Sequence, residues 1–119
     1  SCWKRDRTTG FYWETGEPFF TNSFAGPATD HTTGSGQYLV SDSKGFANGT
    51  DTTFIISPAI DVSSLTSPEI TFWYHMFGSG IKNLKVEINS GAGWNSIFTK
   101  TGAQQTSATS AWKKQRLVL

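Results

Sequence analysis

The chain has 119 residues, of which 16% are charged and 14% aromatic, and its formal net charge is +1. A chain of this length folds as one domain with its own core, and a charge near zero gives no basic footprint for nucleic acid or an anionic membrane. The single cysteine excludes an internal disulfide framework and a zinc site built on several cysteines. No apolar run approaches the roughly 20 residues that span a bilayer. We therefore predict one domain over residues 1–119, without nucleic-acid binding or membrane insertion.

Apolar alternation and turn residues along the chain predict strands, and no segment shows a helical period. The predicted strands cover residues 36–40, 53–57, 69–77, 84–88, 94–99 and 112–119. The segment 84–88 alternates apolar and charged residues, which predicts a half-buried strand, and the turn at 90–93 makes 94–99 its hairpin partner. Short strands at hairpin spacing predict an all-β, antiparallel β-sandwich.

The segment 69–77 is the most apolar of these strands. Alternation places Phe72 and Tyr74 on one face, and Trp73 and His75 on the other. Because both faces are largely apolar, we expect a central strand covered on both sides. The residues expected between two packed sheets are Phe72, Tyr74, Leu84, Val86 and Ile88.

Four segments together resemble one extracellular family. They are GPATDHTTGSGQYL at residues 26–39, ISPAIDV at 56–62, FWYHMFGSG at 72–80 and LKV at 84–86. In order and approximate spacing they are similar to the MAM domain, which is named for meprin, a neuronal surface antigen and a receptor tyrosine phosphatase. The resemblance implies a jelly-roll-like sandwich and an extracellular or cell-surface location.

The resemblance also implies segments outside this chain. MAM domains usually begin upstream of the position of Cys2 and continue well beyond the strand that matches residues 113–119. We therefore expect a fragment of a larger secreted or surface protein, in which Cys2 pairs with a cysteine outside residues 1–119. Trp3 and Trp13 resemble core positions of the family.

The loop DHTTGSG at residues 30–36 allows two interpretations. Asp30, with loop oxygens, offers ligands for Ca²⁺ or Na⁺, and some MAM domains are similar in binding a cation. Alternatively, the Asp30 carboxylate accepts hydrogen bonds from the backbone of a turn in which Gly34 and Gly36 supply positive φ. Both interpretations engage the Asp30 carboxylate in the loop, and neither makes His31 catalytic.

The remaining candidates do not form an active site. His75 lacks a partner in a recognisable catalytic motif, and with His31 it has no third ligand at zinc spacing. Phe19 and Phe20 follow Pro18 in a predicted loop and are candidates for an exposed contact surface. The segment Asn48-Gly49-Thr50 is an N-glycosylation motif for a secreted eukaryotic chain.

The resemblance and the missing catalytic motif predict a non-catalytic module for recognition or adhesion. The resemblance implies partners among surface proteins, or self-association. The alternative is a carbohydrate-binding module attached to a secreted enzyme, because jelly rolls also bind sugars and the clustered aromatics could stack on glycans. We predict no organic cofactor, and Ca²⁺ or Na⁺ as the only candidate ion.

Overall fold

The computed structural model describes residues 2–8, 11–16, 25–41 and 52–119, and the account below is confined to them. These residues form strands and turns without a helix, which confirms the predicted all-β class. The eight strands are β1 (Lys4–Arg5), β2 (Trp13–Gly16), β3 (Tyr38–Ser41), β4 (Ile55–Ile56), β5 (Glu69–Tyr74), β6 (Asn83–Asn89), β7 (Trp94–Thr101) and β8 (Lys113–Val118).

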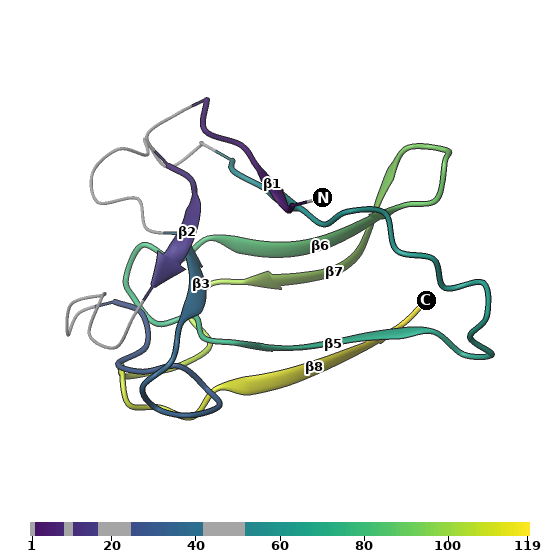
Figure 1. The fold of residues 1–119 in the computed structure, drawn as a ribbon. Helices are drawn as coiled ribbons and strands as arrows, with labels where there is room; N and C mark the ends of the chain where they lie inside the picture. The colour runs from purple at the N-terminus through teal and green to yellow at the C-terminus, as the bar shows by residue number, and fades with distance from the viewer. Residues whose placement is uncertain (1, 9–10, 17–24, 42–51) are drawn as a thin grey trace.

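The strands pair as four antiparallel two-stranded sheets, β1–β4, β2–β3, β5–β8 and β6–β7. The two longer sheets run alongside each other (Figure 1), and β2–β3 lies near the end where β5 stops and β8 begins. β6 and β7 form the predicted hairpin, with an irregularity in register between Val86 and Glu87. In β5–β8 the register is regular, and Trp73 lies opposite Lys114.

The two longer sheets meet through aromatic side chains, as the layers of a β-sandwich do. The Phe98 ring of β7 lies edge-on to Phe72 of β5, with ring centroids 5.5 Å apart, and its centroid is 6.1 Å from that of Tyr74. Along β6, burial alternates as predicted, with Leu84, Val86 and Ile88 half-buried between exposed neighbours. Among the described hydrophobic residues, only Tyr74 and Met76 are less than a tenth exposed.

One expectation for the strand at 69–77 is wrong. The face with Phe72 and Tyr74 packs inward, but the other face is open, and Trp73 is 43% exposed. Regular pairing ends at Tyr74, and no second layer of described residues covers this face. The apolar pattern arises because Trp73 stacks on a loop residue, as described below, and not because the strand is central.

The strands β1 and β2 were not predicted. β2 pairs with β3 along its whole length, and Gly16 lies opposite Tyr38. A Cβ on Gly16 would come within 2.8 Å of the Tyr38 ring, so this glycine allows a close approach of strand and side chain. The tyrosine ring thereby packs over the end of β2.

The core position expected for Trp3 is also wrong, because this side chain is 57% exposed. It lies just before β1, a strand of two residues that, within the described part of the chain, pairs with β4 alone. Such a short ladder cannot bury a neighbouring indole. Trp13 is half-buried in β2, and Cys2 is an exposed free thiol in the described structure. The described residues contain no helix that is long and apolar enough to cross a membrane.

Candidate functional site

The Asp30 loop is a turn built around one carboxylate. Asp30 Oδ2 accepts hydrogen bonds from the backbone N–H groups of Thr32 at 3.0 Å and Thr33 at 2.9 Å. Asp30 Oδ1 accepts one from the Gly36 N–H at 2.9 Å, and the Thr33 hydroxyl donates at 3.2 Å. Asp30 is only 8% exposed, so these donors replace the water that its charge would otherwise require. The carboxylate is thus engaged in its loop, as both interpretations of the sequence require.

The two glycines of this loop have different roles. Gly34 has the expected positive φ, 76°. Gly36 does not have a positive φ, which corrects the prediction. Instead, a Cβ at this position would lie 3.0 Å from the Thr33 hydroxyl and 3.2 Å from Asp30 Oδ2. Gly36 therefore lets its N–H approach the carboxylate closely.

Hydrogen bonding to the charged form lowers the pKa of Asp30 to about 2. The bond from the Thr33 backbone is the largest cause, and those from Gly36 and Thr32 add to it. The donors therefore hold Asp30 as a carboxylate through the whole physiological range. These donors direct hydrogen atoms at both carboxylate oxygens, as expected for a turn that is stabilised by its own backbone.

The cation at Asp30 stays a prediction. Within the described residues, no three His, Cys, Asp or Glu side chains gather in a group that could hold a metal. A hard cation there would have to share the carboxylate with the backbone donors and take its other ligands from hydroxyl and carbonyl oxygens.

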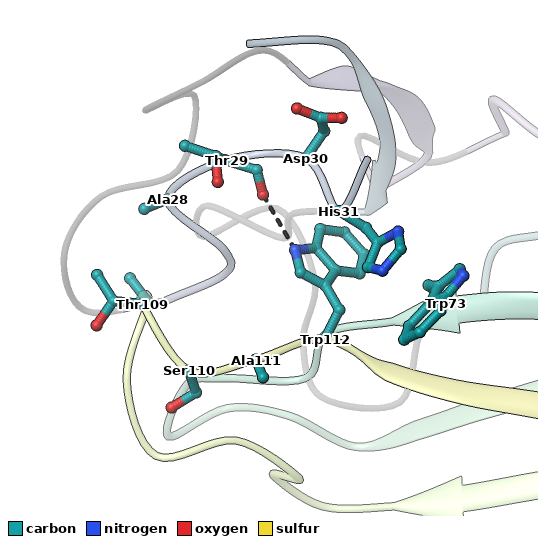
Figure 2. Close-up of a pocket in the computed structure, with 10 residues that line it drawn as sticks. Ala28, Thr29, Asp30, His31, Trp73, Thr109, Ser110, Ala111 and Trp112 are labelled. Atoms are coloured by element: carbon teal, nitrogen blue, oxygen red, sulfur yellow. Dashed lines mark hydrogen bonds between the residues drawn. The ribbon is translucent and has the colours of Figure 1, made fainter. Parts of the chain in front are cut away.

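The loop also positions an aromatic pair. The His31 ring is stacked on Trp73, with centroids 3.6 Å apart and an angle of 17° between the rings. Figure 2 shows the Asp30 carboxylate pointing away from the pair, toward its own loop. The hydrogen bonds to Asp30 thus hold the loop backbone that carries His31, and the His31 ring covers part of the Trp73 ring.

The stacked pair borders a pocket of about 620 Å³. The segment 108–112 also lines the pocket, and the indole of Trp112 lies beside the His31 ring (Figure 2). Trp112 Nε1 donates to the Thr29 carbonyl at 3.1 Å, and the Ala28 N–H donates to the Ala108 carbonyl at 2.9 Å. These bonds join the Asp30 loop to the segment before β8, although the two are far apart in the sequence.

Gln105 holds that segment against the end of β5. Its buried side-chain oxygen accepts the Met76 N–H at 2.7 Å, and its Nε2 donates to the carbonyls of Tyr74 at 3.1 Å and Ala111 at 3.3 Å. One amide thus satisfies backbone groups of two segments just where β5 stops pairing with β8. The pocket wall is fixed by this contact.

His75 is a structural residue of the same region. Its Nε2 lies 3.1 Å from the backbone carbonyl of Ser110, and its ring lies edge-on to Trp112. The Ser110 hydroxyl instead interacts with Ser107, so His75 and Ser110 do not form a nucleophile–base pair. Burial lowers the pKa of His75, and the bond to Ser110 only partly opposes this.

Beyond the pocket, the open face of the β5–β8 sheet combines an indole with charged groups. We call it the outer face; by alternation and register it consists of Glu69, Thr71, Trp73, Lys114, Arg116 and Val118. Lys114 Nζ lies 5.9 Å from the centre of the Trp73 ring. Arg116 forms an ion pair with Glu69 through its Nε and is otherwise exposed. The outer face therefore continues from the pocket into a polar, cationic strip.

Sequence reasoning found Asp30 and His31, but it missed Gln105, Lys114 and Arg116 as parts of one site. Alternation along the final strand places Lys114 and Arg116 on one face and Gln115 and Leu117 on the other. Had the pairing of this strand with 69–77 been predicted, the two cations would have been placed beside Trp73. Nothing in the sequence marks Gln105. The predicted contact residues Phe19 and Phe20 and the glycosylation motif at 48–50 lie outside the described residues.

Comparison with known proteins agrees with this fold. The model of the MAM domain (meprin/A5/mu) matches residues 1–119. This chain belongs to the MAM family. It is 29% identical over 115 residues to Neuropilin-1a of Danio rerio, covering 93% of this chain and 12% of that protein. It is 32% identical over 83 residues to MAM domain-containing protein 2 of Mus musculus, covering 70% of this chain and 11% of that protein.

Neuropilin-1 of Xenopus laevis is similar over nearly the whole chain, with 29% identity over 120 residues, 98% of this chain and 12% of that protein. The chain therefore spans about one eighth of the length of the neuropilins that it matches. No solved structure matches it.

Proposed function

We propose that this MAM domain is a non-catalytic extracellular module that binds another protein, on a secreted or surface-anchored chain. Membership of the MAM family supports this proposal, as does the similarity to neuropilins and to MAM domain-containing protein 2. The structural observation that carries it is Trp73, a large aromatic side chain that is open to solvent and yet held in place.

Such a side chain suits protein recognition for a physical reason. Binding surfaces depend on a few anchors, among which Trp and Arg are enriched, and an anchor that is already ordered loses less entropy on binding. Trp73 is restrained by His31 on its ring and by its strand. A scattered exposed hydrophobic residue would lack this restraint.

A non-catalytic role accords with the chemistry of the described residues. His75 meets a carbonyl and not a hydroxyl, and the Asp30 charge is committed to backbone donors. The Nδ1 atom of His75 is buried without a hydrogen-bond partner among the described residues, and the Asp30 oxygens accept backbone donors, so neither group is placed to exchange a proton with a substrate at the surface.

The proposal is tested by binding of the tagged 119-residue chain to a panel of cells and arrayed extracellular domains. We expect saturable binding that is lost after the cells are treated with protease and retained after enzymatic removal of their glycans. Trp73→Ala should weaken binding, and Trp94→Ala, which removes an exposed indole from the other long sheet, is the matched control.

Two results would contradict the proposal. Binding that survives proteolysis but disappears with the glycans would favour the carbohydrate-binding alternative. Turnover of a substrate by the purified chain would show that the module is catalytic.

A further inference from the structure

We propose that the outer face of the β5–β8 sheet binds an extended, acidic segment of the partner protein, and that one apolar side chain of this segment enters the pocket beside Trp73. This inference rests on the proposed function and names the chemistry of the partner. It follows from the positions of the cations, from their charge balance and from the pocket at the end of the strip.

The cations are spaced for an extended chain. Lys114 lies opposite Trp73, and Arg116 lies opposite Thr71, two residues further along β8 on the same face. Two residues of a strand span about 6.6–6.8 Å, which is also the distance between alternate side chains of an extended ligand. Carboxylates at every second position of a partner segment would therefore meet Arg116 and Lys114 in turn.

The charge balance of this face favours an anionic ligand. It carries two cationic side chains and one carboxylate, whereas the alternating positions of β6 that face solvent carry one of each, Lys85 and Glu87. Within the described residues, Lys114 contacts the Trp73 ring and has no ion pair with a carboxylate. Glu69 binds Arg116 at Nε, and the exposed guanidinium carries further N–H donors for a second carboxylate.

The pocket supplies the apolar part of the site. It adjoins Trp73 at the end of the strip and is lined by Trp112 and by the alanines 28, 108 and 111, with a hydroxyl from Thr109 at its edge. Its volume of about 620 Å³ accommodates a large side chain. Asp30 also lines the pocket, but its carboxylate is turned away from His31 and Trp73 (Figure 2) and accepts backbone donors of its own loop, which offset part of its charge.

The order along the face is thus Arg116, Lys114 and then the pocket beside Trp73. A ligand that matches this order has two acidic side chains and one aromatic side chain at alternate positions of an extended peptide. A sulfated glycan would share the negative charge, but it has no apolar side chain for a pocket walled by indole and alanine. The observations therefore favour an acidic protein segment.

The test uses synthetic peptides and NMR titration of the isotope-labelled chain, which detects millimolar affinities. The probe is acetyl-Thr-Glu-Thr-Glu-Thr-Phe-Thr-amide, and the matched probe replaces both glutamates by glutamine. A third peptide, acetyl-Thr-Thr-Glu-Glu-Phe-Thr-Thr-amide, keeps the composition and breaks the alternation. We expect the first probe to bind at least about tenfold more tightly than the other two, with an affinity that falls as salt rises.

Variants locate the binding site. Lys114→Glu and Arg116→Glu should each weaken binding of the acidic probe by about tenfold or more, and Lys85→Glu makes the same charge change on the other long sheet and should leave it unchanged. Amide shifts should follow β5, β8 and the segment 108–112. Far-UV circular dichroism of every variant confirms that it is folded.

The inference is overturned if the acidic probe causes no shifts at millimolar concentration, if the glutamine probe binds equally well, or if Lys85→Glu weakens binding as much as Lys114→Glu. Tighter binding of heparin than of any peptide, through the same two cations, would assign the face to sulfated glycans instead. If Lys114→Glu and Arg116→Glu keep full protease-sensitive binding to cells, this assignment fails while the proposed function stands.

Discussion

Trp73 and Trp94 project from the two longer sheets, and they are similarly open to solvent, at 43% and 53%. Their surroundings differ. Trp73 is stacked on His31 and has Lys114 near its ring, whereas Trp94 lies opposite Asn89 at the end of a hairpin and has no ring contact within the described residues. Exposure alone therefore does not distinguish a recognition site. What distinguishes Trp73 is that neighbouring loops restrain it.

The restraint on Trp73 comes from two loops that the sequence places far apart. The Asp30 loop carries His31, and the segment after Gln105 carries Trp112, which is bonded back to the Asp30 loop. Trp94 instead follows the turn at 90–93, where Gly91 and Gly93 have positive φ and no such cross-link is present among the described contacts.

The largest effect is expected where the two sheets meet. Phe72→Ala removes the ring that contacts Phe98 and Tyr74 and should lower the free energy of unfolding by about 3 kcal/mol, the lower end for a large aromatic because Phe72 is only half-buried. Trp94→Ala should change it by less than about 0.5 kcal/mol. Urea unfolding of both variants measures the difference; equal effects would show that the inner faces do not form the core.

Removal of the Gln105 amide should have the next largest effect. Gln105→Met keeps the length of the side chain but leaves the Met76 N–H and the Tyr74 carbonyl without their partner, for a loss of about 1–3 kcal/mol in unfolding free energy. Gln104→Met is the control, because the neighbouring amide bonds only exposed or half-exposed carbonyls of its own turn. Hydrogen exchange at the Met76 amide should accelerate in the first variant only; unchanged exchange would contradict the role of Gln105.

A smaller effect is expected at Asp30. The lowered pKa, about 2 against a usual 3.8, means that its contribution to stability is complete above about pH 4 and is lost as the pH falls through 2. Asp30→Asn should lower the melting temperature by several degrees at pH 7 and flatten its decline between pH 4 and pH 2. Glu87→Gln, at an exposed position of β6, is the control. An unchanged acid profile in Asp30→Asn would contradict this account.

The wild-type chain and Asp30→Asn also test whether a cation binds at Asp30. If the backbone donors alone complete the turn, melting temperatures with EDTA and with added Ca²⁺ will coincide. A rise with Ca²⁺ that disappears in Asp30→Asn would support the cation instead.

Much of the fold could be predicted because it follows from local patterns. Alternation at 84–88 and the glycine-rich turn after it determine the β6–β7 hairpin, and the resemblance to MAM domains gave the β-sandwich. The short ladders were missed because β1 has two residues and β2 contains Glu14 and Gly16, which give no apolar alternation. Their pairing depends on strands far along the chain.

The site was predictable only in part, for the same reason. The spacing of Asp30 from Thr33 and Gly36 indicates a turn, and the turn is present. The stack of His31 on Trp73 and the approach of Lys114 to that ring depend on which strands pair, and a sequence does not display this. The face of the strand at 69–77 that carries Trp73 was therefore expected to be covered, although it forms part of the candidate binding surface.

The smallest effect is expected at His75, and it separates the two histidines of the site. Burial lowers the pKa of His75 from its usual 6.5, so the unfolded chain binds a proton at a pH where the folded chain does not. The contribution of His75 to stability is thus complete above about pH 6.5 and declines as the pH falls below it.

His75→Gln keeps a donor for the Ser110 carbonyl and removes the titration, so its unfolding free energy should vary less between pH 7 and pH 5 than that of the wild type. His31→Gln is the control, because it removes the exposed histidine and retains His75. Urea unfolding at a series of pH values measures both variants, and a wild-type slope that persists unchanged in His75→Gln would contradict this account.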